Sequence, residues 1–554
     1  MGKVDGGQLV IKALQKEGVK YIFSLSGGHI LRIYAASVGT EIKIIDTRHE
    51  QAAGHMAEGW SLSTGEMGVC AVTAGPGLTD AVTAVANAYL SNSPMLIFGG
   101  RSALFENDIG SLQDLDQMAL MQPITKWAKV CYETKRIPEY ISMAYRHALS
   151  GRPGPVYLEI PFDILSQEVE EADVAFPEKY RTPYRPAGNL QAIKAAAEIL
   201  AKAEKPLILS GSGGFWSQAG EALTAFAEKA DIPVITRTYG RGILPDSHRL
   251  AITGGTIELL MTGVTQADAI LLLGSRLNFS LLYGRVIPPN VKIIQVDIEG
   301  SELGFNRGPD VGIHGDIKLV LEQLTEQVPA TSDRAWAREI KQIVQSSTEM
   351  TQAAINMEAV PIHPQRLVND IRDVVGPEGI YICDGGDIHI FGFETFPAER
   401  PGSILTTSQQ FGCLGVGLPY AIAAKLANPD RTVILLSGDG TFGLNGMEFD
   451  TALRHGLPIV CIVGNDQAWG MIKHGMEIQF GNDKVCGCDL GPVRYDLMVE
   501  GLGGHGEFVE RPEDIKPALE RALKSGKPAC INVLTDPTLS HPSTKMAAEM
   551  LGPY

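Results

Sequence analysis

Short apolar runs recur along the whole chain, and each is followed by a glycine-rich or polar turn. Apolar runs bounded in this way are typical of buried strands. The predicted strands are 21–25, 42–45, 68–73, 95–98, 154–161, 206–209, 293–296, 380–383, 433–436 and 457–463. The periodicity of the intervening segments predicts helices at 6–18, 51–63, 81–89, 190–203 and 447–454. Because strands alternate with helices, the fold class is α/β, with doubly wound parallel sheets.

Two connecting stretches divide this pattern into three parts. Residues 166–190 are acidic and then proline-rich, which is typical of a linker, and residues 328–362 are predicted to be a mostly helical connection. A chain of 554 residues is also too long for a single core. We therefore predict three α/β domains, at 1–180, 190–340 and 360–554.

Composition narrows the possible partners and compartment. The net charge of −17, without a basic block, argues against nucleic acid as a main partner. No run of about 18 apolar residues suggests a membrane span, and the first residues, 1–5, lack the apolar core of a signal peptide. The eight cysteines are scattered, and only Cys486 and Cys488 lie close together, without a second pair to complete a zinc site. We expect reduced cysteines and a cytoplasmic protein.

The stretch Val433–His474 carries the most specific chemistry. Its first strand ends at Gly438-Asp439-Gly440, a polar turn and the helix at 447–454 follow, and the next strand ends at Gly464-Asn465-Asp466-Gln467. A right-handed crossover places both acidic turns at the carboxyl edge of one parallel sheet. Mg²⁺ binds through one or two carboxylates, waters and phosphate oxygens. The stretch therefore predicts a metal–diphosphate cradle, whereas a Gly-Asp-Gly alone is an ordinary turn.

This arrangement resembles the thiamine-diphosphate motif of the acetolactate synthase and benzaldehyde lyase superfamily. The resemblance implies that Asp439, Asp466 and the carbonyl of Ala468 bind Mg²⁺. The family commonly has Asn-Asn where this chain has Asn465-Asp466. That departure keeps the ligand type and adds a negative charge.

Glu50 is the predicted activating residue. An acid at a helix start usually caps the helix or interacts with its dipole. However, Arg48-His49-Glu50, followed by small residues at 52–54, resembles the pyrimidine-binding segment of the superfamily. The resemblance implies that Glu50 hydrogen-bonds the aminopyrimidine of the cofactor and activates it, a role that a buried carboxylate with a raised pKa suits.

Three further residues are predicted to handle protons. Ser26-Gly27-Gly28-His29 is similar to the benzaldehyde lyase segment Gly-Ala-His, and Gln113 matches a glutamine that reaches the activated cofactor. His389 stands where benzaldehyde lyase has a catalytic tyrosine, and we expect it to titrate near neutral pH. Each also has a purely structural alternative. His29 would be a turn histidine, Gln113 a polar residue at a helix start, and His389 a histidine in a surface loop.

The resemblance also implies a set of cofactor contacts around these residues. In it, Leu414 supports the bent shape of the cofactor and the Gly412 carbonyl holds its amino group. The remaining contacts are Thr73, Gly386, Asp387, Ile388, Gly438, Gly440, Thr441, Trp469, Gly470 and Met471. The middle, Rossmann-like domain can hold FAD, ADP or nothing in this superfamily. Because Gly-Ser-Gly-Gly at 211–214 is only a partial fingerprint, an empty, structural middle domain is favoured.

The resulting hypothesis is a thiamine-diphosphate-dependent carboligase or lyase that makes or cleaves 2-hydroxy ketones from aldehydes. The alternative is an acetolactate synthase-like enzyme or a 2-oxo acid decarboxylase, which the synthase-like segment Gly443–Asp450 favours. A non-catalytic subunit is disfavoured because Glu50 and Asp439 are both present. Acyl-CoA substrates are less expected, because the tail lacks a basic cluster for CoA phosphates.

The resemblance also implies how the chain assembles. The pyrimidine-binding domain of one subunit faces the diphosphate-binding domain of another, so a homodimer is the functional minimum and a homotetramer is expected. The first and third domains should share a topology. The tail, residues 540–554, is a candidate lid over the pocket.

Overall fold

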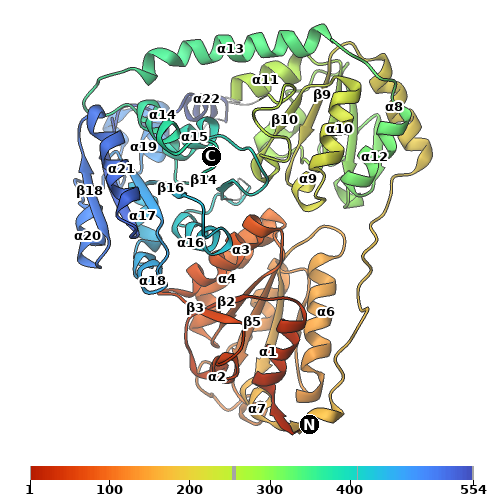
Figure 1. Cartoon of the computed structure of the whole chain (residues 1–554), viewed down its shortest axis with the longest axis vertical. Coiled ribbons are helices and arrows are strands. Elements are labelled where there is room, and N and C mark those ends of the chain that lie inside the picture. Colours follow the sequence, from red (N-terminus) through yellow and green to blue (C-terminus); the bar gives the residue numbers. More distant parts are fainter. Residues whose placement is uncertain (1, 253–256, 408–409, 552–554) are drawn as a thin grey trace. The chain divides into compact units, whose positions relative to one another are not determined.

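Three parallel β-sheets organise the protein, as the computed structural model in Figure 1 shows. It describes residues 2–252, 257–407 and 410–551. Every pairing between neighbouring strands in these three sheets is parallel. The predicted α/β class with three parallel-sheet domains is therefore confirmed, while the domain boundaries stay predictions.

The first sheet has the strand order β3-β2-β4-β5-β7-β6. Its strands are β2 (Tyr21–Ser24), β3 (Lys43–Asp46), β4 (Gly68–Val72), β5 (Met95–Arg101), β6 (Ala128–Val130) and β7 (Val156–Pro161). The surrounding helices are α1 (Gly6–Lys16), α2 (Leu31–Ser37), α3 (Glu50–Thr64), α4 (Pro76–Ser91), α5 (Gln117–Met121), α6 (Ile137–Leu149) and α7 (Phe162–Ser166). Buried residues of α1 and α6, such as Leu9 and Ile141, share one core with Phe98 and Leu158 of the strands. Helices α3 and α4 lie side by side.

The middle sheet has the order β10-β9-β11-β12-β13. Its strands are β9 (Pro206–Ser210), β10 (Val234–Thr236), β11 (Ala269–Leu273), β12 (Lys292–Asp297) and β13 (Val311–His314). The helices of this part are α8 (Leu190–Lys202), α9 (Ser212–Trp216), α10 (Gly220–Ala230), α11 (Ile257–Gln266) and α12 (Ile317–Gln327). The long helix α13 (Ala335–Ile355) then forms the predicted helical connection.

The third sheet has the order β15-β14-β16-β17-β19-β18. Its strands are β14 (Ile380–Asp384), β15 (Ile404–Thr406), β16 (Val433–Gly438), β17 (Val460–Asn465), β18 (His505–Val509) and β19 (Ala529–Leu534). The helices are α14 (Pro364–Val375), α15 (Asp387–Thr395), α16 (Gly417–Ala427), α17 (Asp439–Asn445), α18 (Glu448–Arg454), α19 (Gly470–Phe480), α20 (Tyr495–Gly501), α21 (Ile515–Lys524) and α22 (Pro542–Leu551).

The first and third sheets have the same topology, as predicted. The second strand along the chain lies at one edge, the first lies next to it, and the third continues in the opposite direction. The direction of winding therefore changes between β2 and β4 in one sheet, and between β14 and β16 in the other. Such switch points open a crevice at the carboxyl ends of the strands, where α/β proteins bind ligands.

Strands β6, β10, β13, β15, β18 and β19 of the three sheets were not predicted. Two other segments differ from the expected elements. Helix α17 occupies most of the stretch predicted as a polar turn after Asp439, because consecutive main-chain groups there complete a helical turn at the end of β16. The predicted linker contains β8 (Glu168–Glu170), which pairs antiparallel with β1 (Lys3–Asp5). Strand β8 has only three residues, and two of them are charged, so no apolar run marks it in the sequence.

The chain forms two compact units that do not follow chain order. One consists of Met1–Pro183, Phe411–Ala427 and Asn445–His455, and the other consists of the remainder. Helix α16 belongs to the first unit because it packs on α3, where Gly59 lets the chain approach Tyr420 closely. A Cβ atom at Gly59 would lie 3.0 Å from Cα of Tyr420. Helix α18, also in this unit, contacts the end of β3.

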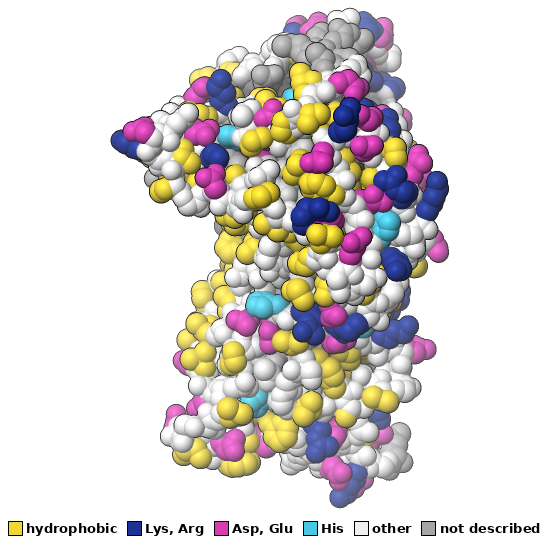
Figure 2. All heavy atoms as spheres, turned by 90° about the vertical axis from the view of Figure 1, so that its left-hand side faces the viewer, with side chains coloured by type: hydrophobic (Ala, Val, Ile, Leu, Met, Phe, Trp, Pro, Cys, Tyr) yellow, Lys and Arg dark blue, Asp and Glu magenta, His cyan; other side chains and the backbone are white. Residues whose placement is uncertain are grey.

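The surface and the helices agree with the composition. On the face drawn in Figure 2, acidic and basic side chains are interspersed among uncharged ones. Within the described ranges, no helix combines the length and apolar character needed to cross a bilayer.

Candidate active site

The two acidic turns of the third sheet lie at neighbouring strand ends. Strands β16 and β17 pair in register, with Gly438 opposite Gly464. Asp439 and Asp466 therefore follow at the same edge, one residue beyond β16 and one residue beyond β17. This is the arrangement that the strand–helix–strand pattern predicted.

The electrostatics of this pair fit a cation. Burial raises the pKa of both carboxyls, and the neighbouring Asp466 raises the pKa of Asp439 further. Asp439 is only 3% exposed; its Oδ1 accepts from the Gly440 amide, while Oδ2 has no hydrogen-bond partner among the described residues. A buried carboxylate with a free oxygen, next to a second, partly buried carboxylate, is energetically unfavourable unless a positive charge lies beside them.

The donor set fits Mg²⁺ rather than a thiol- or imidazole-bound metal. In the described ranges, no three His, Cys, Asp or Glu side chains gather in a way that could hold a metal ion. A site with two carboxylates can be completed by a main-chain carbonyl, waters and phosphate oxygens, which are the usual partners of Mg²⁺. The carbonyl of Ala468, in the same turn as Asp466, is the predicted third protein ligand.

The backbone of the second turn is strained and tightly packed. Gln467, between the two predicted ligands, has φ of 62°, a conformation that residues other than glycine rarely adopt. A Cβ atom at Gly470 would lie 2.1 Å from Oδ2 of Asp466, so a side chain there would collide with the carboxylate. Strain of this kind persists where the surrounding structure holds it, commonly at functional sites.

Two helices begin at this edge without side-chain caps. Helix α15 starts at Asp387 after Gly386, and α19 starts at Gly470 after Trp469. A Cβ atom at Gly386 would lie 2.8 Å from Cβ of Met471, so the two helix starts are close together. Free N–H groups at helix starts bind anions, which suits a diphosphate. The structure thus brings Gly386–Ile388 and Trp469–Met471 together, as predicted.

The side chain of Asp387 has a role that the sequence did not reveal. Its carboxylate accepts from Thr544 Oγ1 at 2.6 Å and from the His541 amide at 3.1 Å, and its Oδ2 lies 3.2 Å from Nδ1 of His474. These contacts fasten the chain at the start of α22, which packs against α19. The predicted lid therefore contains an anchored helix, and its last residues, 552–554, lie outside the described residues.

His389 lies on α15 but differs from expectation in its ionisation. Its Nε2 is 2.6 Å from Oγ1 of Thr406. Burial, together with the nearby His541, lowers the pKa of His389 to about 4. The expectation that it titrates near neutral pH is wrong, because an imidazolium is disfavoured in this desolvated position.

Glu50 lies at the first turn of α3, after β3. The side chain of His49 accepts from the Gln51 amide and caps the helix, so capping does not account for Glu50. The Glu50 side chain is 8% exposed, and burial raises its pKa, with a further contribution from Asp80. These are the properties expected of a carboxylate that shares a proton with a ring nitrogen.

His29, Thr73 and Gln113 meet beside Glu50 at the switch point between β2 and β4. Nδ1 of His29 is 3.1 Å from Oγ1 of Thr73, and the nearby Gln113 side chain raises the pKa of His29, against the larger effect of burial. Thr73 and Oε1 of Glu50 both lie against Gly77. Burial lowers the pKa of His29, so its imidazole is held neutral. Gln113 has φ of 61°, a second strained residue at a predicted site.

Sequence reasoning missed the residue that supports this group. Gln117 is 2% exposed; its Oε1 accepts from the Gly75 amide at 2.8 Å, and its Nε2 donates to the Gly100 carbonyl and to Glu159. It therefore fastens the turn after β4 to the end of β5. No local pattern marks it, because its partners are distant in sequence.

The predicted contacts divide between the two compact units. Glu50, His29, Thr73, Gln113, Gly412 and Leu414 belong to the unit that contains the first sheet. Leu414 is half-buried, Gly412 is exposed, and Cys413 between them lies 3.7 Å from Nε2 of His55 on α3. The other unit contains the turns predicted to bind the metal, His389, and residues 438, 440–441 and 469–471.

Three segments of the chain match models of known protein domains. Residues 4–120, 193–324 and 384–533 match, respectively, the N-terminal TPP binding domain, the central domain and the C-terminal TPP binding domain of thiamine pyrophosphate enzymes.

Several full-length relatives are also similar to the chain. It is 35% identical over 541 residues to a probable acetolactate synthase of Mycobacterium bovis, with 97% of each chain covered. It is 31% identical over 557 residues to a 2-hydroxyacyl-CoA lyase of Arabidopsis thaliana, with 96% of each covered. It is 30% identical over 558 residues to 2-hydroxyacyl-CoA lyase 1 of Mus musculus, covering 97% of this chain and 94% of that protein.

The matched domains include both cofactor-binding regions, and the similarity to these relatives extends over nearly the whole length of each. The chain thus belongs to the thiamine-diphosphate-dependent enzymes of the acetolactate synthase superfamily, which form or cleave carbon–carbon bonds.

Proposed function

We propose that this enzyme makes or cleaves 2-hydroxy ketones by joining or releasing aldehydes. The observation that carries the proposal is the group of His29, Thr73 and Gln113 beside Glu50. A neutral histidine that is oriented by a hydroxyl and lies near an amide side chain can accept or donate the hydroxyl proton of an aldehyde adduct near neutral pH.

The protein residues divide the remaining tasks. Thiamine diphosphate supplies the nucleophilic carbon and the electron sink. Glu50 would hold the proton at its pyrimidine ring, and the free amides at the starts of α15 and α19 would bind its diphosphate. Asp439, Asp466 and the Ala468 carbonyl would hold Mg²⁺. His389, with its lowered pKa, would act as a neutral hydrogen-bonding group toward the substrate.

A second candidate function is decarboxylation or condensation of pyruvate-type 2-oxo acids. It is favoured by the synthase-like segment Gly443–Asp450 and by the similarity to a probable acetolactate synthase. Cleavage of a 2-hydroxyacyl-CoA is a third chemistry to test, because two of the relatives bear that name.

The middle domain is proposed to be structural, without bound FAD or ADP. This proposal is supported by the packing of its glycine loop, where the Gly213 amide donates to the Gly274 carbonyl at 3.2 Å. A Cβ atom at Gly211 would lie 2.5 Å from the same carbonyl oxygen. The loop is thus occupied by main chain, whereas a phosphate-binding loop keeps its amides available for the ligand.

The active form is proposed to be a homodimer at least, and a homotetramer is in keeping with the superfamily. Each part of the predicted site carries exposed apolar side chains that a second copy could cover. Phe105, Ile109 and Leu112 are 72–78% exposed next to Gln113, and Ile472 and Phe480 are 59% and 47% exposed on α19. All eight cysteines are free thiols, which supports a reducing, cytoplasmic location.

Product analysis tests the proposed function. With thiamine diphosphate and Mg²⁺, we expect formaldehyde, acetaldehyde or benzaldehyde to yield hydroxy ketones without release of CO₂. Formation of CO₂ from pyruvate without aldehyde coupling would contradict the proposal and favour the second candidate. A 2-hydroxyacyl-CoA serves as the third substrate, and a release of formyl-CoA from it alone would favour that chemistry instead.

Replacing Glu50 tests the activation step. Glu50→Gln keeps the size of the side chain but cannot take up a proton, so we expect turnover to fall at least 100-fold while cofactor affinity changes less than tenfold. Steady-state rates and fluorescence titration with thiamine diphosphate measure the two effects. Asp80→Asn, which removes a nearby charge only, is the control. Undiminished turnover in Glu50→Gln would disprove the role.

Replacing the metal-binding carboxylates distinguishes their contributions. We expect Asp439→Ala to weaken Mg²⁺-dependent cofactor binding at least 100-fold, because a buried charged ligand is lost. Asp466→Asn keeps a ligand oxygen and relieves the repulsion with Asp439, so its binding should stay within tenfold of wild type. Equilibrium binding at several Mg²⁺ concentrations measures both, and equal losses in the two variants would contradict the assignment.

A complementation experiment tests whether two chains share each site. Glu50→Gln and Asp439→Ala chains are each expected to be inactive. If one chain supplies Glu50 and another supplies Asp439, a mixed dimer has one intact site and one with both defects. Random mixing after dissociation should therefore restore about a quarter of the wild-type activity. No recovery, with mixed dimers demonstrated by differential tags, would place both residues of a site on one chain.

A further inference from the structure

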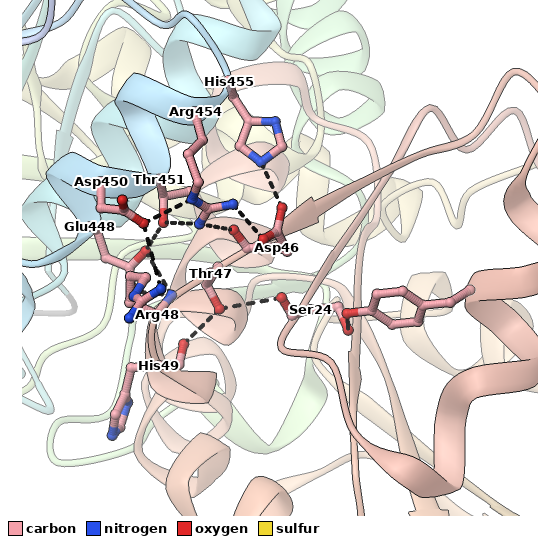
Figure 3. Close-up of polar contacts among 11 residues, drawn as sticks. Ser24, Asp46, Thr47, Arg48, His49, Glu448, Asp450, Thr451, Arg454 and His455 are labelled. Atoms are coloured by element: carbon pink, nitrogen blue, oxygen red, sulfur yellow. Dashed lines mark hydrogen bonds and ion pairs between the residues drawn. The ribbon is translucent and has the colours of Figure 1, made fainter.

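Helix α18 contacts the five-residue connection Asp46–Glu50, which ends at the proposed activating glutamate. Figure 3 shows the contacts of α18 with the first residues of this connection. The contacts come from a segment about 400 residues further along the chain, within the same compact unit. No residue of α18 was predicted to touch the cofactor, so this set of contacts has no role in the proposed chemistry so far.

Glu448 makes the central contact. Its Oε1 and Oε2 lie 3.0 and 3.3 Å from the main-chain nitrogen of Arg48, which donates to them, and Oγ1 of Thr451 donates to Oε2 at 2.5 Å. The Glu448 side chain is 1% exposed. Arg48 stands two residues before Glu50, so this carboxylate fixes the backbone immediately ahead of the activating residue.

Flanking contacts fix the beginning of the same connection. Nη2 of Arg454 donates to the Asp46 carbonyl at 2.9 Å, its Nη1 pairs with the Asp46 carboxylate, and Nε2 of His455 lies 3.1 Å from Oδ1 of Asp46. Thr47 is tied to β2, since its amide donates to the Ser24 carbonyl at 2.9 Å. The connection is thus held at three successive residues, and only Glu50 and its neighbour His49 lie beyond them.

Ionisation of the buried Glu448 side chain lowers the stability of the fold. Burial raises the pKa of Glu448 to about 7, although Thr451 and the amides of Arg48 and His49 oppose the shift. Because this pKa lies above the ordinary value of 4.5, the ionised form costs stability progressively as pH rises from about 4.5 to about 7. A glutamine at this position could also accept a hydrogen bond from the Arg48 amide. The presence of an ionisable carboxylate therefore needs a reason other than satisfying that amide.

We propose that Glu448 is a positioning residue, whose carboxylate holds the Asp46–Glu50 connection so that Glu50 is placed for activation of the cofactor. The proposal rests on the proposed function of Glu50. A charged acceptor holds an amide more firmly than a neutral one. Small displacements of an activating group reduce rates strongly, so a firm hold on its backbone affects catalysis without touching the cofactor.

The neighbours of Glu448 determine which variant is the right control. The titratable or charged groups that face it or its contacts are Asp46, Arg48, His49, Asp450, Arg454 and His455. Asp450 is on the same helix and pairs with Nε of Arg454 at 2.8 Å, but no contact joins it to the Arg48 amide. Asp450→Asn therefore removes one negative charge from α18 without removing the acceptor under test.

The first test measures activation directly. Exchange of the thiazolium C2 proton of bound thiamine diphosphate with deuterated solvent needs no substrate. We expect Glu448→Gln and Glu448→Asp to slow this exchange about tenfold, with cofactor affinity within twofold of wild type. Asp450→Asn should change the rate less than twofold. Rates within twofold of wild type in both Glu448 variants would overturn the proposal.

The second test separates positioning from a purely structural role. Glu448→Gln removes a buried charge, so its melting temperature at pH 8 should equal or exceed that of wild type, whereas loss of a structural contact would lower it. In wild type, the C2 exchange rate should fall as pH decreases through about 7, because Glu448 is then protonated. In Glu448→Gln, the part of the pH dependence that comes from Glu448 should be absent. A lower melting temperature with an unchanged pH profile would contradict positioning.

A third measurement keeps this inference distinct from the proposed function. In the cofactor-free protein, hydrogen–deuterium exchange of the Arg48 amide should be at least tenfold faster in Glu448→Gln than in wild type. If wild type failed to bind thiamine diphosphate, the proposed function would be wrong and the positioning role would fall with it. If wild type binds and exchanges C2 normally but Arg48 protection is unchanged in the variant, only this inference is overturned.

Discussion

Parallel main-chain pairing is the constraint on which the predicted site depends. Strands that run in one direction end at one edge, so the residues following each strand have to lie together whatever their separation in sequence. At the third sheet this brings Asp439 next to Asp466, and at the first it brings His29 next to Thr73. The shared strand order of these two sheets makes the two switch points equivalent. We propose that one carries the diphosphate and metal contacts, and that the other carries the activating and proton-handling groups.

Desolvation at these edges determines the ionisation of the site. Burial raises the pKa of Glu50, Asp439 and Asp466, and it lowers the pKa of His29 and His389. Each shift favours the neutral form, because a low-dielectric environment penalises charge of either sign. For the carboxylate pair, the divalent cation that we propose to bind there would offset the penalty. For the histidines, desolvation favours the neutral imidazole, which can donate and accept hydrogen bonds. Desolvation thus accounts for the direction of the pKa shifts of the predicted residues in each of the two compact units.

Buried polar contacts that the sequence did not predict fix three segments of the chain. Gln117 fastens the turn after β4, Asp387 fastens the segment at the start of α22, and Glu448 fastens the connection that carries Glu50. Each is a buried polar side chain that binds main-chain or hydroxyl groups from a distant part of the chain. Buried polar groups of this kind are stable only when they are satisfied, which makes the local geometry nearly unique.

The sequence by itself determined the layers and the chemistry of the local motifs. Apolar runs located ten strands of the three sheets to within a few residues, and glycines beside acids at two strand ends identified the turns predicted to bind ligands, because those features depend on neighbours along the chain. Asp439 and Asp466 were found in this way, whereas Glu50 was identified from the resemblance of its segment to the pyrimidine-binding segment of the superfamily. The tertiary structure alone decided the roles of Gln117 and Glu448, since each acts on a partner that only folding brings near. It also decided the ionisation of His389, because a pKa depends on the groups that exclude water around it, and no local pattern records them.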